Sequence, residues 1–181
     1  MSRLVYSTTM SLDGFIAGAG GDMQWLSAHA GGSNPQARAL LDRTGALLIG
    51  ARTFGGDDPN AGTDQEGAFG GAWSGPSIVL THDAGRSSGD PDVTFVDDLE
   101  RAAALAIEAA GTKDVTVLGA DVSRQLIEHG LLDEILVMVA PVLLGDGVRL
   151  FELAGGTDVR LDLVERPEGD LPCLRYRVLD A

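Results

Sequence analysis

The feature that most constrains the fold is a β-strand pattern that stops at a glycine and becomes a helical pattern at once. The apolar, β-branched run 115–118 ends at Gly119, and a helical pattern follows from Asp121, with Leu126 and Ile127 on one face. The first backbone N–H groups of such a helix have no internal partners and favour negative charge. The segment therefore predicts either a phosphate site or an ordinary tight turn, in which Asp121 caps the helix.

The same alternation of strand and helix patterns continues along the chain. Runs rich in β-formers predict strands at 4–10, 46–49, 77–81, 93–96, 115–118, 133–140, 160–166 and 173–179. Helical spacing predicts helices from Pro35 with Asn34 as its cap, from Asp97 or Asp98 to Gly111, and from Asp121 to His129. The run 133–140 is nearly all apolar, as in a strand buried on both faces, whereas 160–166 and 173–179 alternate like half-buried strands.

Strands joined by helices favour a three-layer α/β fold. We expect a mostly parallel central sheet with helices on both faces and an antiparallel C-terminal edge. In open sheets of this kind, ligands bind beyond the carboxyl ends of the strands. Gly50, Thr81 and Gly119 all fall at such ends, so the sequence predicts a shared site there.

Composition limits the classes of protein to which the chain can belong. Its 181 residues are 44% hydrophobic, which suits a single domain over 1–181. No apolar run reaches the roughly 18 residues of a membrane span, and Cys173 is the only cysteine, so we expect no membrane association and a cytoplasmic location. The formal net charge of −14 argues against nucleic acid as a partner.

One long segment has the composition of a loop. Residues 55–76 contain seven glycines and two prolines. Long loops inside compact domains are usually functional or mobile. Two interpretations stay open: a lid in which Phe69 and Trp73 shield a bound ligand from water, or a mobile surface insertion.

Four motifs follow one another along nearly the whole chain. They are Ser11-Leu12-Asp13-Gly14-Phe15-Ile16-Ala17 with Gly21-Asp22-Met23-Gln24-Trp25-Leu26, then Leu48-Ile49-Gly50-Ala51-Arg52-Thr53-Phe54, then Val117-Leu118-Gly119-Ala120-Asp121, and finally Leu131-Leu132-Asp133-Glu134 continuing to Leu150-Phe151. In this order they resemble the dihydrofolate reductase-like superfamily. The match is nearest to the branch that contains the reductase domain of riboflavin biosynthesis.

The resemblance implies NADPH binding and hydride transfer to a small-molecule substrate. By position, it assigns Gly50, Arg52 and Thr53 to cofactor phosphates, Thr81 and His82 to the 2′-phosphate, Gly119, Ala120, Asp121 and Val122 to the pyrophosphate, and Thr9, Ile16 and Ala17 to the nicotinamide. Histidine at 82, where arginine is common, leaves the preference for NADPH over NADH open. Ile16 fits a core position equally well.

Two further residues are candidates for the catalytic site. Trp25 resembles the tryptophan that flanks the substrate in this superfamily, or it anchors a glycine-rich loop. Asp13 lies in the Ser-Leu-Asp-Gly turn, where it has either a catalytic role or the structural role of capping the turn.

The pattern departs from true dihydrofolate reductases at the first helix. Gln36, Ala37 and Arg38 stand where those enzymes carry a pterin-facing acid, so the resemblance favours the phosphorylated pyrimidine of riboflavin synthesis. Arg38 and Arg43 are either ligands of its phosphate or solvated helix residues. A cofactor-binding homologue without turnover and a dihydrofolate reductase are the alternatives. The three histidines show no metal-ligand spacing, so a metal enzyme is not expected.

We also expect a homodimer. The segment from Ile135 to Leu144 is too apolar for an open surface, and the strands after it need an edge partner or cover. The riboflavin-type branch is generally dimeric, and the resemblance places 141–147 near the contact.

Overall fold

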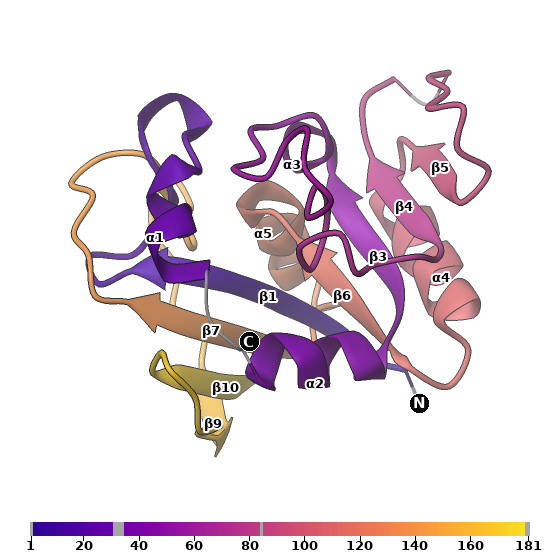
Figure 1. The fold of residues 1–181 in the computed structure, drawn as a ribbon. Coiled ribbons are helices and arrows are strands. Elements are labelled where there is room, and N and C mark those ends of the chain that lie inside the picture. Colours follow the sequence, from indigo (N-terminus) through magenta and orange to yellow (C-terminus); the bar gives the residue numbers. More distant parts are fainter. Residues whose placement is uncertain (1, 31–34, 84, 180–181) are drawn as a thin grey trace.

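The computed structural model describes residues 2–30, 35–83 and 85–179, and its centre is an eight-stranded sheet (Figure 1). The strand order is β5 (Val93–Val96), β4 (Ser77–Leu80), β3 (Thr44–Gly50), β6 (Asp114–Leu118), β1 (Leu4–Ser11), β7 (Glu134–Ala140), β10 (Cys173–Val178) and β9 (Leu161–Glu165). The first six strands are parallel, and β10 and β9 pair antiparallel at the edge. The expected fold class, including the antiparallel C-terminal edge, is confirmed.

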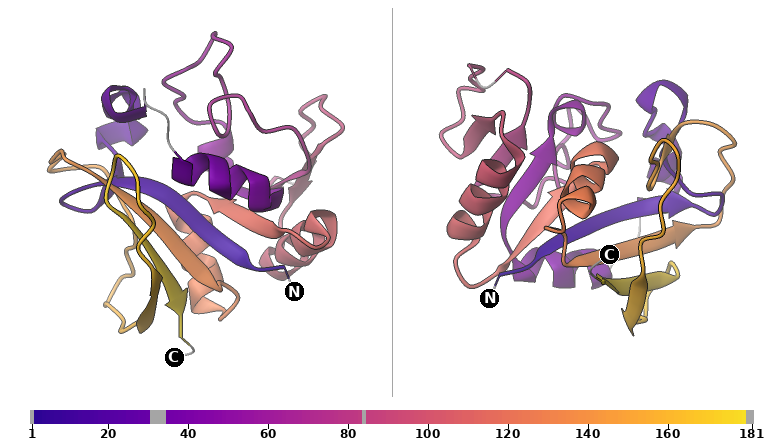
Figure 2. Two further views of the ribbon diagram at one scale, coloured as in Figure 1. Left: turned by 60° about the horizontal axis from the view of Figure 1, so that its bottom comes forward. Right: turned by 180° about the vertical axis from the view of Figure 1, so that it is seen from behind.

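Helices α4 (Leu99–Ala110) and α5 (Ala120–Glu128) cover one face of the sheet (Figure 2). The alanines of α4, together with Val122 and Leu126 of α5, pack on strand side chains such as Tyr6 and Leu48. Small side chains on α4 let this helix approach the sheet closely. Asp98 caps α4 by accepting a 2.7 Å hydrogen bond from the Arg101 backbone N–H, as one of the two predicted caps.

Helix α2 (Pro35–Arg43) covers the other face, and Leu40 packs there with Val5, Leu136, Met138 and Cys173. Pro35 is the first helical residue, as expected, whereas Asn34, its predicted cap, lies outside the described residues. The two faces of β1 separate by simple alternation, because Leu4 and Tyr6 belong to the α4–α5 side and Val5 to the α2 side.

Several short elements were not predicted, because each is held by tertiary contacts rather than by its own periodicity. They are β2 (Phe15–Ala17) paired with β8 (Val148–Arg149), the 3-10 turns η1 (Ala19–Gly21) and η2 (Gln24–Leu26), and helices α1 (Ser27–Ala30) and α3 (Ala51–Phe54). Helix α3 is a single turn that begins directly after β3. It forms the second half of the second family motif, which begins in β3.

The structure corrects the expected burial of β9 and the argument for a dimer surface at β7. Strand β9 was predicted to be half-buried, but all five residues are exposed, because β9 is the edge strand and no helix covers it. Strand β7, whose apolarity suggested a dimer surface, lies inside the sheet between β1 and β10 and is buried within one chain. Exposed apolar side chains are instead found on β9, at Leu161, Leu163 and Val164, and in the loops at Leu12 and Leu143.

The loop 55–76 is built by its own polar contacts. Asp58 accepts hydrogen bonds from the backbone N–H groups of Asn60 and Gly67, and Phe69 packs against the cluster beneath α2. Trp73 donates to Gly75 O and Ser77 Oγ, both at 3.2 Å, beside the start of β4. Trp73 thus lies at the amino-terminal end of the parallel strands, so the expectation that it shields a ligand at their carboxyl ends is wrong.

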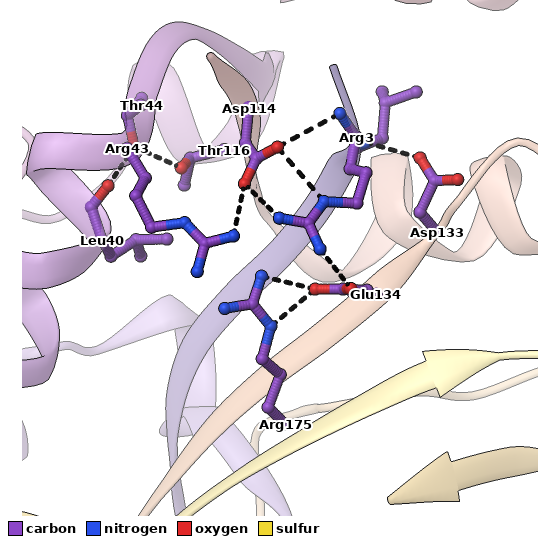
Figure 3. Close-up of polar contacts among 10 residues, drawn as sticks. Arg3, Leu40, Arg43, Thr44, Asp114, Thr116, Asp133, Glu134 and Arg175 are labelled. Atoms are coloured by element: carbon purple, nitrogen blue, oxygen red, sulfur yellow. Dashed lines mark hydrogen bonds and ion pairs between the residues drawn. The ribbon is translucent and has the colours of Figure 1, made fainter. Parts of the chain in front are cut away.

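A cluster of charged residues ties the amino-terminal ends of the strands together (Figure 3). Arg3 bridges Asp114 at 2.9 Å and Glu134 at 2.7 Å, while Arg43 and Arg175 add a second guanidinium to each carboxylate. Arg43 is therefore ion-paired with Asp114 at the amino-terminal ends of the strands, opposite the ends where Gly50 and Gly119 lie. Of its two predicted roles, the structure therefore does not favour that of a substrate-phosphate ligand, and it adds an ion pair that neither alternative included.

Candidate functional site

Strand register brings the predicted phosphate residues to one edge of the sheet. Ile49 of β3 pairs with Leu118 of β6, so Gly50 and Gly119 are the next residues of two adjacent strand ends. Gly50 itself pairs with Leu80 of β4, and Thr81 follows directly. The three strand-end residues that the sequence predicted to share a site therefore lie at adjacent positions.

Gly119 makes the closest approach at this edge. It is the N-cap of α5 and has φ 109° and ψ 138°, a conformation that favours glycine. A Cβ at this position would lie 2.5 Å from Thr53 Oγ1 and 3.8 Å from the backbone nitrogen of Gly50. The β6–α5 turn and the β3–α3 turn therefore touch through a glycine that no other residue replaces without displacement.

This arrangement fits a phosphate group. The turn has no side-chain cap, so the first N–H groups of α5 point out of the strand end beside the Thr53 hydroxyl. The first α5 amide that pairs back is that of Ser123, which donates to Gly119 O at 3.2 Å. Backbone donors, a hydroxyl and a helix N-terminus thus converge at Gly119, where any side chain would collide with Thr53.

Asp121 does not cap the helix, contrary to expectation. Helix α5 already begins at Ala120, so Asp121 lies inside the first turn and its carboxylate bonds along the helix, to Arg124 at 2.9 Å and Gln125 at 3.1 Å. Arg52 of α3 approaches the same carboxylate at 3.7 Å, with 85% of its side chain exposed. Burial would raise the pKa of Asp121, but the bond and charge of Arg124 and the charge of Arg52 outweigh it and lower that pKa.

The other residues predicted to bind phosphate differ in which of their groups a ligand could reach. Val122 is 1% exposed and packs under Gly50, so only its backbone is available to a ligand. Thr81 is buried, donates its N–H to Val96 O and accepts from the Asp83 N–H through its hydroxyl. His82 is exposed beside it.

Asp13 holds together the loops at the end of β1. It accepts hydrogen bonds from the backbone N–H groups of Leu144 at 3.1 Å and Gly145 at 2.7 Å, and from Ser11 Oγ at 2.6 Å. These bonds, led by that of Ser11, lower the pKa of Asp13 to about 2. Asp13 therefore anchors the 141–147 segment to the β1–β2 turn, which is the structural role that the sequence left open.

Trp25 carries an unsatisfied donor. Among the described residues, its Nε1 is the buried side-chain nitrogen or oxygen that lacks a hydrogen-bond partner. Leaving such a buried donor unpaired costs about 1–3 kcal/mol of folding free energy, so Nε1 is expected to bind an acceptor.

The residues predicted to contact the nicotinamide lie on two strands that are consecutive in the chain. Thr9 is half-buried on β1, while Ile16 and Ala17 are buried on β2.

The structure adds a residue that the sequence did not single out. Asp57, just after α3, accepts from the Met23 N–H at 3.1 Å and from Gln24 Nε2 at 3.3 Å. It thereby fastens the segment that carries Trp25 to the segment that carries Arg52. An acid within the glycine-rich loop was its only signal in the sequence.

Comparison with known proteins places this geometry in a family. The family model of the RibD C-terminal domain matches residues 3–168. The chain belongs to the RibD C-terminal domain family. Within the part of this family member that the structure describes, no helix is long and apolar enough to cross a membrane, and no three His, Cys, Asp or Glu side chains group as metal ligands.

Relatives with solved structures share the whole fold. A putative riboflavin biosynthesis protein from Shewanella sp. PV-4 has a TM-score of 0.74 and 25% identity, over 99% of this chain and all of that one. The deaminase/5-amino-6-(5-phosphoribosylamino)uracil reductase of Thermotoga maritima has a TM-score of 0.67 and 16% identity, over 98% of this chain and 57% of that one. The uncharacterised protein YwjB of Bacillus subtilis is 24% identical over 161 residues, 88% of each chain.

Proposed function

We propose that this RibD C-terminal domain protein is an NADPH-dependent reductase, which transfers hydride to a small heterocycle of the class reduced in riboflavin synthesis. The observation that carries the proposal is the close approach of Gly119 to Thr53 at the strand-end edge, which sets the uncapped start of α5 beside a hydroxyl, the donors that a pyrophosphate requires. Family membership supports the reductase class, and one structural relative bears the name of a phosphoribosylamino-uracil reductase.

Each part of the chain has a separate task in this proposal. Bound NADPH supplies the hydride. The α5 amides, Thr53 and Arg52 bind its phosphates, and Thr9, Ile16 and Ala17 border the nicotinamide. Trp25 Nε1 donates its unused hydrogen bond to an oxygen of the substrate, and Asp13 positions the surrounding loops. Positioning and exclusion of water are most of what hydride transfer requires from a protein.

Helix α2 separates this proposal from dihydrofolate reduction. Its first turn carries the buried Gln36 and no acid, and its one acid, Asp42, is exposed near the other end. A neutral amide cannot supply the charge that a protonated pterin needs. Binding without turnover is the second candidate, and it is favoured by the engagement of Asp13 in three structural hydrogen bonds.

Titration with NADPH, followed by a substrate panel, tests the proposal. Quenching of tryptophan fluorescence measures binding, and loss of NADPH absorbance measures turnover with the riboflavin-pathway pyrimidine and with dihydrofolate. We expect binding, turnover of the pyrimidine, and little or none of dihydrofolate. Binding without turnover would support the second candidate, and an ordinary rate with dihydrofolate would overturn the assignment.

Trp25→Phe provides the matched variant for the substrate contact. It keeps an aromatic ring but removes the N–H donor that has no partner in the protein. We expect KM for the pyrimidine to rise by about tenfold, the loss of one hydrogen bond to a buried group, while NADPH affinity stays unchanged. An unchanged KM would remove Trp25 from the substrate site.

We further propose that the protein is a cytoplasmic homodimer. The exposed apolar side chains of β9, together with the free hydrogen-bonding edge of that strand, support an interface there rather than at β7. A cytoplasmic location suits both its single, unpaired cysteine and the proposed use of NADPH.

A further inference from the structure

Arg86 occupies an unusual position in the β4–β5 loop. Its guanidinium carbon lies 5.3 Å from the ring centroid of Phe95, a residue of β5. The Phe95 ring in turn makes an edge-on contact with Phe54 of α3, with 5.6 Å between centroids and 90° between planes. Two aromatic rings thus connect Arg86 to the helix turn that carries Arg52 and Thr53.

The other arginines at this edge are already paired with carboxylates. Arg124 pairs with both Asp121 and Glu128, and Arg52 shares Asp121 at 3.7 Å. Arg86 has no ion pair within residues 2–30, 35–83 and 85–179, and an aromatic ring supports it instead. A guanidinium that is supported by an aromatic ring rather than by a carboxylate has N–H donors available for an oxyanion.

The position of Arg86 suits the adenosine half of a dinucleotide. The pyrophosphate cradle lies at the ends of β6 and β3, and β1 and β2 lie on one side of it, where the nicotinamide is proposed to bind. The other half must then extend over β3 and β4 toward β5. Strands are spaced by about 4.8 Å, so β5, whose Phe95 holds Arg86, lies roughly 10 Å from β3, about the length of an adenosine.

We propose that Arg86, held on Phe95, binds the 2′-phosphate of NADPH and determines the preference of this protein for NADPH over NADH. The inference rests on the proposed function. A dianionic phosphate on the ribose matches a guanidinium that has no carboxylate partner, and Arg binds phosphate through a rigid fork of donors. The family resemblance assigns this group to Thr81 and His82, but Thr81 is buried and its hydroxyl accepts a hydrogen bond from the Asp83 N–H.

Binding measurements with four nucleotides test the assignment. Affinities of the parent chain and of Arg86→Ala are measured by calorimetry for NADPH, NADH, adenosine 2′,5′-bisphosphate and AMP. We expect Arg86→Ala to weaken NADPH and the bisphosphate by about tenfold or more, the loss of a charge-assisted contact, and to leave NADH and AMP within about twofold. An equal loss for all four ligands, or no loss for any, would overturn the proposal.

Two further variants separate local recognition from general electrostatics. Arg177→Ala removes the same charge from an exposed position of β10, three strands beyond β6 in the sheet, and should change none of the four affinities. Arg86→Lys keeps the charge but loses the planar fork, so its NADPH affinity should fall between those of the parent chain and Arg86→Ala. A loss for Arg177→Ala as large as that for Arg86→Ala would show that net charge alone sets the affinity.

The same data distinguish the two proposals. If the parent chain and Arg86→Ala bind NADPH equally well, the role assigned to Arg86 is wrong and the proposed reductase function stands. If the parent chain binds neither NADPH nor the bisphosphate, both proposals fail.

Discussion

Arg175 Nε donates a 2.6 Å hydrogen bond to Glu134 Oε2, and both residues are almost fully buried, with 7% and 2% exposure. Arg3 donates to the other oxygen of the same carboxylate at 2.7 Å. One acid at the start of β7 therefore holds the chain before β1 and the antiparallel strand β10 (Figure 3). A buried charge of this kind is tolerated because each oxygen has a charged donor.

Glu134→Gln should be strongly destabilising. The variant leaves a buried guanidinium without its counter-charge, so we expect a loss of about 3–5 kcal/mol in the free energy of unfolding, measured by urea titration. Arg177→Ala, an exposed position on the same strand as Arg175, should change it by less than about 0.5 kcal/mol. Equal urea midpoints for the two variants would contradict this account of the cluster.

Asp114 should make the stability depend on acid pH. Burial would raise the pKa of Asp114, but the hydrogen bond and charge of Arg3 and the charge of Arg43 outweigh it and hold this pKa below the ordinary 3.8. The unfolded chain therefore takes up the proton first, so the stabilisation is complete above pH 3.8 and is lost as the pH falls through the lowered value. The difference in free energy of unfolding between the parent chain and Asp114→Asn should be largest at neutral pH and should become smaller below pH 3.8. Denaturant midpoints across this range, with exposed Asp64→Asn as control, measure this difference; a constant difference would refute the linkage.

Gly119→Val should abolish NADPH binding in a protein that still folds. The new Cβ meets Thr53 Oγ1, fills the space proposed for the pyrophosphate, and is strained at φ 109°. Gly130→Ala is the matched control, since Gly130 also has positive φ but would place its Cβ in open space. Circular dichroism checks folding and calorimetry checks binding. Normal NADPH binding by Gly119→Val would show that the turn is only structural.

Arg52 and Asp121 should have opposite effects on cofactor affinity. Arg52→Ala removes a charge proposed to contact phosphate and should weaken NADPH binding by about 1.5–3 kcal/mol. Asp121→Asn frees Arg52 from a competing carboxylate at 3.7 Å, so affinity should rise by about twofold to fivefold, a gain that salt reduces. Calorimetry at low and high salt measures both effects. Weaker binding by Asp121→Asn would mean that the carboxylate orients Arg52 rather than competing for it.

The chain should form a dimer through β9. Light scattering at micromolar concentration should give twice the mass of one 18.8 kDa chain. Leu163→Asp places a charge on the exposed edge strand and should yield monomers that still fold, because Leu163 lies outside both clusters of buried core residues. A dimer that persists in this variant would place the interface elsewhere.

The sequence by itself determined the elements whose signals are local. Hydrophobic periodicity located the eight strands of the sheet and helices α2, α4 and α5 to within a few residues, because a period of two or 3.6 is written into the chain itself. The glycine at the end of β6 likewise predicted the sharp turn from this strand into a helix, and Gly119 has the positive φ of such a turn. Chain order also predicted the parallel sheet and its antiparallel edge.

Only the tertiary structure decided which side chains meet across long sequence separations. Asp13 bonds Gly145 over 132 residues, Asp57 bonds the segment before Trp25, and Arg86 rests on Phe95, and no periodicity records such contacts. It also placed Arg43 and Trp73 at the opposite strand ends from the proposed cofactor site. The physical reason is that a helix or strand forms from neighbours in sequence, whereas a site forms from strand order and register, which the packing of the whole chain selects.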